Sequence, residues 1–184
     1  MIETPNLILR TWRESDYAPF AALNGDEMVM RYYPSALTPE ESMALIKRRI
    51  EPHFRRHGFG FWAIERKGDG RFLGLCGLEY VNVPCPVKGE VKATWRLARH
   101  AWGAGYAFEA ASAALQFGFK ALQLEQIVAF SVPANERSIR LIGRLGMIRR
   151  SELDFDHPSY SAEDPRRRYV VYSRARATSG CGGE

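Results

Sequence analysis

The order of apolar segments along this chain limits its fold more than any other feature. Short apolar runs typical of strands alternate with longer helical patterns, in the order strand, two helices, three strands, helix, strand, helix and two strands. Such a mixed order predicts an α/β or α+β protein with a mixed sheet. With 184 residues and no repeat or linker, the sequence predicts a single domain over residues 1–176 and a disordered, glycine-rich tail over 177–184.

Local signals place the individual elements. Strands are predicted at 7–10, 59–65, 71–81, 90–98, 126–132, 147–153 and 168–173. Helices are predicted at 14–23, 39–50, 104–121 and 135–145. Ser15 or Asp16 is the expected N-cap of the first helix, and Thr38 is the expected N-cap of the second. Gly74 and Gly77 interrupt one strand, and predict a bulge or a close approach of two backbones there.

Composition excludes several classes of protein. Hydrophobic residues make up 46% of the chain and charged residues 26%, as in soluble globular proteins. No apolar run approaches the roughly 20 residues of a membrane span, and the pattern of residues 1–5 predicts no secretory signal. The three cysteines form neither a disulfide framework nor a zinc pattern. We therefore expect a cytoplasmic protein with no metal and no membrane partner.

The net charge of +5 has three interpretations: an ordinary basic surface, an anionic ligand, or a nucleic acid. The run Arg166-Arg167-Arg168 motivates the third, an RNA-binding module. No recognised RNA-binding motif accompanies that run, so no nucleic-acid partner is predicted.

The segment 99–107 carries the clearest chemical signal. It follows a predicted strand, opens a predicted helix, and contains Gly103 and Gly105. Glycines there let the backbone turn with free N–H groups, and the helix N-terminus adds partial positive charge, so the segment suits a phosphate or pyrophosphate. A simple strand-to-helix turn has the same sequence, and the segment alone does not separate the two interpretations.

The pattern His100-x-x-Gly103-x-Gly105 resembles the coenzyme A pyrophosphate loop of the GNAT acetyltransferase superfamily. That loop reads Arg or Gln, two residues, Gly, one residue, then Gly or Ala. His100 departs from the pattern at the first position. The backbone cradle depends on the glycines and is unaffected.

The resemblance covers residues 5–174. Six segments of the chain are similar to segments of the branch that includes the N-terminal acetyltransferases of ribosomal proteins, and they occur in the same order and with the same spacing. They are 4–10, 27–32, 60–64, 72–78, 135–140 and Leu145-Gly146-Met147.

Membership of this superfamily implies a mixed, mostly antiparallel sheet of six to seven strands with flanking helices. The parallel strands 90–98 and 126–132 would splay apart, and the pantetheine arm of acetyl-coenzyme A would pair with the first of them. The implied cofactor-binding residues are Trp95, Leu97, Ala98, His100, Trp102, Gly103, Ala104, Gly105, Tyr106, Ala107, Asn135, Ser138, Arg140 and Arg144.

The resemblance also implies catalytic roles for three residues. Ser138 would donate to the leaving thiolate, because no tyrosine lies on its helix, and Asn135 would contact the pantetheine arm or an ordered water. Glu90 would act as general base, and the N–H near Leu97 would stabilise the oxyanion. Two other interpretations stay open: Asn135 as a helix cap, and Glu90 as an exposed charge at a strand end.

The sequence thus predicts an N-acetyltransferase that moves an acetyl group from acetyl-coenzyme A to a primary amine in a ternary complex. The acceptor would be a protein N-terminus or a small amine, and the protein a monomer or homodimer. The alternatives are a non-catalytic acyl-coenzyme A-binding regulator and, last, an RNA-binding module.

Overall fold

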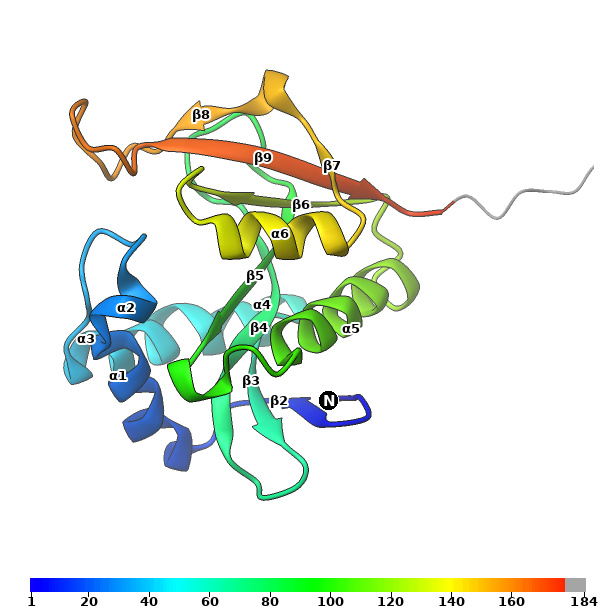
Figure 1. Cartoon of the computed structure of the whole chain (residues 1–184). Coiled ribbons are helices and arrows are strands. Elements are labelled where there is room, and N and C mark those ends of the chain that lie inside the picture. The colour runs from blue at the N-terminus through cyan, green and yellow to red at the C-terminus, as the bar shows by residue number, and fades with distance from the viewer. Residues whose placement is uncertain (178–184) are drawn as a thin grey trace, which may run out of the picture.

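The computed structural model describes residues 1–177, and a mixed sheet forms its centre (Figure 1). The strands pair in the order β1-β2-β3-β4-β5-β6-β9-β7, and β8 pairs with β9. Every pair is antiparallel except β5 with β6. The strands are β1 (Ile2–Glu3), β2 (Leu7–Arg10), β3 (Phe61–Arg66), β4 (Phe72–Tyr80), β5 (Val91–Leu97), β6 (Gln126–Ser131), β7 (Ile148–Arg149), β8 (Phe155–Asp156) and β9 (Arg168–Ala175).

Helices cover both faces of the sheet. They are α1 (Tyr17–Gly25), α2 (Glu27–Met30), α3 (Pro39–Leu45), the π-helical turn η2 (Ile46–Ile50), α4 (Glu51–His57), α5 (Tyr106–Lys120) and α6 (Glu136–Arg144). Single 3-10 turns occur at η1 (Glu14–Asp16), η3 (Arg99–Ala101) and η4 (Ser151–Leu153). Thr38 caps α3 as predicted: its hydroxyl accepts from the Glu41 N–H, and the Glu41 carboxylate accepts from the Thr38 N–H.

Two hydrophobic clusters hold the helices against the sheet. On one face, the fully buried alanines Ala110, Ala111 and Ala114 let α5 lie close to β4 and β5. On the other face, residues from α1 and η2, among them Phe20 and Ile50, pack against β3 and β4. Adjacent residues of β5 therefore face two different layers, one made by α5 and one made by the N-terminal helices.

The β5 and β6 strands part soon after they meet. Their parallel pairing contains one registered pair, Lys92 with Val128, whereas β4 and β5 share seven. Beyond Lys92, β5 continues to Leu97 without a registered partner on β6. The predicted mixed sheet with a splay between these strands is confirmed. Along this edge, backbone N–H and C=O groups are left available to a ligand.

The close backbone approach predicted at Gly74 and Gly77 is also confirmed. An added Cβ at Gly74 would lie 2.2 Å from the Arg96 carbonyl oxygen, and one at Gly77 would lie 2.0 Å from the Gly60 carbonyl oxygen. Opposite Gly74, the β3–β4 register shifts between Ile64 and Glu65, which marks an irregularity in the ladder.

The predicted strand over 147–153 is largely wrong. Only Ile148–Arg149 pairs as β7, and the chain then turns through η4, where the Leu153 N–H donates to the Arg150 carbonyl. This turn lets the chain return as β8 and pair with the opposite end of β9. The sequence prediction also missed β1, α2 and β8, each four residues or fewer, and it ended the second helix at residue 50, whereas α4 continues to His57. Apart from Ala177, the predicted tail lies outside the described residues.

Candidate functional site

The glycine loop leads from the open end of β5 into α5. Gly103 and Gly105 adopt the left-handed conformation, with φ of 79° and 82°. An added Cβ at either position would meet no described atom within 4 Å. Glycine is therefore favoured at both positions by the left-handed backbone conformation, and not by neighbouring atoms that would exclude a side chain. The open space above both leaves room for a ligand against the backbone.

The N-terminus of α5 has no capping side chain. Gly105 occupies the N-cap position, and the first turn closes when the Glu109 N–H donates to the Gly105 carbonyl at 3.1 Å. The N–H groups of Tyr106, Ala107 and Phe108 precede that bond, and point out of the helix end as unpaired donors do. A bare N-terminus of a 15-residue helix beside two left-handed glycines fits a phosphate or pyrophosphate group.

Glu109 is the one acidic residue in the first turn of α5, and its carboxylate is engaged elsewhere. It accepts from the Thr4 hydroxyl at 2.5 Å and from the Asn6 backbone and amide at 2.8 and 3.0 Å. Burial alone would raise the pKa of Glu109, but these donors outweigh it and hold the pKa below its usual range. The charge therefore anchors the N-terminal segment.

His100 occupies the position where the superfamily pattern has Arg or Gln. Burial lowers the pKa of His100, and the nearby Arg71 and Arg66 lower it further. The imidazole is therefore neutral at pH 7, because its pKa lies below the ordinary value of about 6.5. The backbone donors and Arg71 consequently supply the positive potential near the loop.

We expect affinity for coenzyme A to respond to the charge on His100. Lowering the pH from 8 to a value below the pKa of His100, which itself lies below the ordinary value of about 6.5, should protonate His100 and favour a pyrophosphate nearby, by about threefold relative to the His100→Gln variant. Comparing the two proteins isolates this effect from titration of the cofactor's own phosphate. Calorimetric titrations at several pH values would measure it, and parallel curves for both proteins would contradict it.

Two arginines of α6 cover the loop and α5. The Arg137 guanidinium lies 4.7 Å from the Trp102 ring centroid, and that of Arg144 lies 4.5 Å from the Phe108 ring centroid. The Trp102 indole N–H in turn donates to the Leu97 carbonyl at 2.8 Å. These contacts connect α6 with the β5–α5 loop across the parted strands.

Arg140, which the sequence favoured, instead pairs with Glu136 on the exposed side of α6, at 3.0 Å. Arg137 is not among the cofactor-binding residues that the sequence implied. The seven-residue spacing of Arg137 and Arg144, two helical turns, was the signal that could have shown that these two share a face.

Asn135 and Ser138 lie together at the start of α6. The Asn135 side-chain oxygen accepts from the Ser138 N–H at 3.3 Å, so Asn135 caps the helix. Both side chains are partly buried. The Asn135 amide nitrogen and the Ser138 hydroxyl are not used by this cap.

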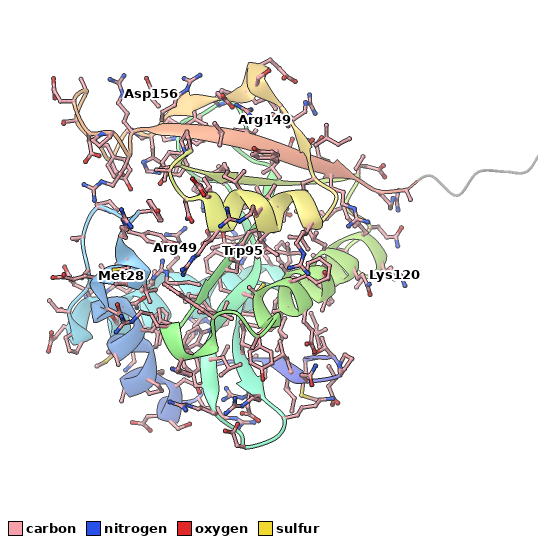
Figure 2. All side chains as sticks on the ribbon, in the orientation of Figure 1. Met28, Arg49, Trp95, Lys120, Arg149 and Asp156 are labelled. Carbon is pink, nitrogen blue, oxygen red and sulfur yellow. The ribbon has the colours of Figure 1, made fainter. Side chains whose placement is uncertain are left out.

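Three further predicted residues line the open half of β5. Trp95 is partly buried, and it packs against the cluster under α5 (Figure 2 labels it). Leu97 is registered with Gly74 on β4, and the Ala98 N–H donates to the Leu73 carbonyl at 2.9 Å. All three therefore follow Lys92, where β5 and β6 part.

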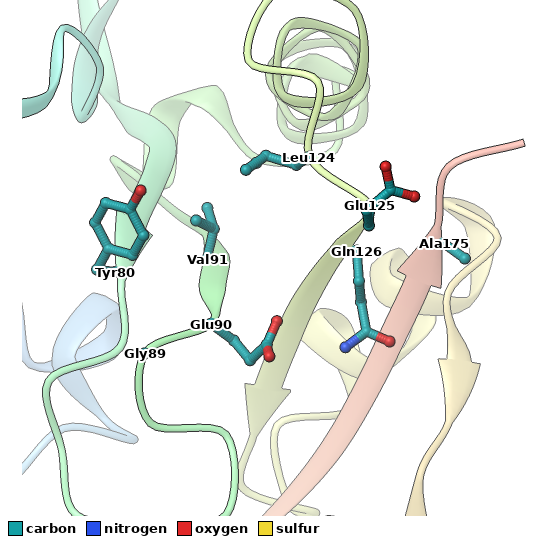
Figure 3. A pocket seen from close by; sticks show the side chains of 8 residues that line it. All are labelled: Tyr80, Gly89, Glu90, Val91, Leu124, Glu125, Gln126 and Ala175. Atoms are coloured by element: carbon teal, nitrogen blue, oxygen red, sulfur yellow. The ribbon is translucent and has the colours of Figure 1, made fainter.

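Glu90 lies at the opposite end of β5. Figure 3 shows its carboxylate in a pocket of about 500 Å³ beside Gln126, at the start of both strands. Five residues of extended strand between Glu90 and Trp95 span roughly 17 Å. The structure therefore does not bring Glu90 together with the other predicted site residues. The role of Glu90 as general base stays a prediction, and Glu90 does not contact those residues.

Within residues 1–177, no group of three or more His, Cys, Asp or Glu side chains is arranged to hold a metal ion. None of the helices in this part of the chain is long and apolar enough to cross a membrane.

The sheet parts at two parallel strands and a glycine-lined helix N-terminus lies at the open end, as the resemblance to the GNAT superfamily implies. Residues 6–148 match the sequence profile of the acetyltransferase (GNAT) domain. The chain therefore belongs to the GNAT acetyltransferase family and is an N-acetyltransferase. Enzymes of this family use acetyl-coenzyme A.

The chain is also similar to one curated protein in sequence and to two solved structures in fold. The chain is 32% identical over 147 residues to the uncharacterised protein YkkB of Bacillus subtilis, covering 78% of this chain and 83% of that protein. The spermidine N-acetyltransferase of Vibrio cholerae, solved with coenzyme A and spermine, superposes with a TM-score of 0.73 at 16% identity, covering 94% and 97% of the two chains. RimL, a ribosomal L7/L12 α-N-protein acetyltransferase solved with coenzyme A, gives 0.74 at 15% identity, covering 94% and 95%.

Proposed function

We propose that this chain transfers the acetyl group of acetyl-coenzyme A to a primary amine by direct attack in a ternary complex. The observation that carries the proposal is that β5 and β6 part after a single registered pair, and that the parted stretch of β5 leads to the uncapped, glycine-lined start of α5. An elongated ligand with amide groups and a pyrophosphate can pair with the strand edge and end at that helix.

The cofactor-binding residues follow from this arrangement. The N–H groups of the loop and of the first turn of α5 would hold the pyrophosphate, and β5 from Trp95 to Ala98 would pair with the pantetheine amides. Arg137 and Arg144, which already face the loop and α5, are better placed than Arg140 to meet the remaining phosphate. Asn135 and Ser138 would contact the arm from α6.

The acetyl-coenzyme A substrate supplies an activated thioester. The acceptor nitrogen forms a bond to the acetyl carbon, the carbon–sulfur bond breaks, and the ammonium proton passes to water. A free N–H of β5, beyond the stretch that pairs with the pantetheine amides, would donate to the carbonyl oxygen, where negative charge develops. The Ser138 hydroxyl would donate to the departing thiolate.

The need for a base depends on the acceptor. The α-amine of a protein N-terminus, with a pKa near 7.7 to 8, is about a tenth neutral at pH 7, so it loses its proton without a strong base. Water can take that proton, which agrees with the distance of Glu90 from the parted strands. Glu90 remains a candidate only for a relay through several waters.

The deciding experiment follows thiol release from acetyl-coenzyme A with a panel of primary amines, alongside calorimetric binding of the cofactor. Micromolar binding together with amine-dependent thiol release supports the proposal. Binding without turnover on any amine would favour the alternative, a non-catalytic acyl-coenzyme A-binding regulator, and no binding would exclude both.

Ser138→Ala is expected to lower kcat by about 10- to 100-fold and to leave the KM for acetyl-coenzyme A nearly unchanged, because the lost donor acts on the leaving thiolate. Ser138→Thr keeps a hydroxyl on the same helix turn and should retain most of the activity. Steady-state kinetics of the two variants test this, and equal activity of Ser138→Ala and the wild type would remove Ser138 from the mechanism.

A further inference from the structure

The face of β5 turned away from α5 carries buried charge that cofactor binding does not explain. Lys92, Thr94 and Arg96 alternate with Ala93 and Leu97, which belong to the cluster under α5. Lys92 is also the residue at which β5 and β6 part. Its side chain therefore lies at the fork of the two strands, on the side of the N-terminal helices.

Three cations and one carboxylate meet on this face. Arg49 from η2 binds Glu79 of β4 through two hydrogen bonds of 2.7 and 2.6 Å, and the Lys92 ammonium lies 3.7 Å from the same carboxylate. Lys92 and Glu79 are directly opposite each other in the β4–β5 register, and their side chains are only 15% and 4% exposed. Arg96 follows on the same face of β5, so these residues carry a surplus of two positive charges.

Arg96 has one guanidinium donor without a partner among the described residues. Its guanidinium donates to the Asn24 side chain at 2.5 Å and stacks 4.2 Å from the Tyr33 ring centroid. Its Nε is buried and has no hydrogen-bond partner among residues 1–177. A buried guanidinium N–H without an acceptor is costly, so a ligand that supplies an anionic oxygen would stabilise this arrangement.

Neighbouring groups titrate as they would in a positive environment. Burial would raise the pKa of Tyr33, but Arg96, Lys92 and Arg49 outweigh it and hold the pKa below its usual range. Burial lowers the pKa of His157, and Lys92 lowers it further. For Lys92 itself, burial is the largest cause of a lowered pKa, which Arg49 reinforces and Glu79 opposes. The one buried carboxylate thus leaves the positive potential of the face uncancelled.

Two loops are joined beside this face. The Arg166 guanidinium, in the β8–β9 connection, donates to the Tyr33 carbonyl at 2.6 Å, and the Tyr160 hydroxyl donates to the Tyr32 carbonyl at 3.2 Å. The Tyr32 hydroxyl in turn donates to the Ala134 carbonyl at 2.9 Å, next to the start of α6. Hydrogen bonds therefore hold three segments together beside this face. This arrangement leaves less room for a folded protein than for a small acceptor.

We propose that the amine acceptor of this enzyme is a small molecule bearing a carboxylate, which Arg96 and Lys92 bind beside the fork of β5 and β6. The inference rests on the proposed acetyl transfer, and gives its substrate class. Glu79 holds Arg49 and Lys92 in place on this face. A polyamine, which is wholly cationic, would meet electrostatic repulsion there.

The test uses matched acceptors in the thiol-release assay: glycine, β-alanine, methionine, phenylalanine and glutamate, the α-carboxamide of each (for β-alanine its only carboxamide), and spermidine. At least one amino acid should show kcat/KM 30-fold or more above its carboxamide. Arg96→Gln should reduce that ratio to about threefold or less by slowing the amino acid only, and Arg96→Lys should restore part of it. Arg55→Gln, at an exposed α4 arginine paired with Glu51, should leave the ratio unchanged.

Two kinds of result would overturn the proposal: carboxamides or spermidine turned over as fast as the amino acids, or a ratio that Arg96→Gln leaves intact. Lys92→Gln provides a second variant if Arg96→Gln does not fold. Calorimetric binding of the same pairs to the coenzyme A-loaded protein separates the two claims. A tenfold binding preference for carboxylates without turnover would sink the proposed function and support only the carboxylate-binding part of this inference. Turnover without that preference would support the proposed function and overturn this inference.

Discussion

Gly77→Ala is expected to lower the free energy of unfolding by about 3 kcal/mol, because the new methyl group would collide with backbone. Its Cβ would lie 2.0 Å from the Gly60 carbonyl oxygen and 2.8 Å from the Phe61 Cα. Neither atom belongs to a flexible side chain, so relief requires moving β3 and β4 apart. That movement would disturb the central ladder, which is covered on both faces.

Urea denaturation of the wild type and the variant measures this change. Gly68→Ala is the matched control, because Gly68 lies in the turn between the same two strands and its added Cβ would meet nothing within 4 Å. The control should remain within about 0.5 kcal/mol of the wild type. If Gly77→Ala lost less than 1 kcal/mol, the close backbone contact at that position would be wrong.

Gly105→Asp is expected to weaken binding of acetyl-coenzyme A by about 30-fold or more without unfolding the protein. The carboxylate would stand at the uncapped start of α5, where a pyrophosphate a few ångströms away would meet repulsion of about 2 kcal/mol at intermediate dielectric. Aspartate adopts the left-handed conformation more readily than most residues, and an acid favours a helix N-terminus. Folding should therefore be nearly preserved.

Gly105→Asn provides the control, since it has the same shape and backbone tolerance but no charge. It should weaken the cofactor only about three- to fivefold. Calorimetric binding with thermal melts of both variants separates electrostatics from folding. Equal affinities of the Asp and Asn variants would contradict the placement of the pyrophosphate at this helix end.

The sequence predicted the local features of the fold well, because their causes are local. The capping box of Thr38 and Glu41, the glycine turn before α5 and the bounds of β2 each depend on a few neighbouring residues. The strand predicted at 147–153 failed, because the turn at η4 depends on pairing with β9, a segment about 20 residues further on. Short elements such as β1 and β8 depend on such pairing too.

In the candidate site, too, the sequence predicted local features correctly and missed those that depend on distant segments. Gly103 and Gly105 can be recognised from spacing alone, since positive φ and helix initiation follow from glycine itself. Glu90 was predicted beside the reacting group because it begins the right strand. The structure places it at the far end, since the strands part toward their carboxyl ends and not toward their starts.

The sequence by itself therefore determined the order of the elements, the mixed sheet and the glycine-lined start of α5. The tertiary structure alone decided where β5 and β6 part, that Arg137 rather than Arg140 faces the loop, and that Arg49, Glu79, Lys92 and Arg96 meet on one face. These residues are separated by 4 to 30 or more positions, and strand register and helix packing bring them together. Spacing along the chain carries no direct record of those contacts.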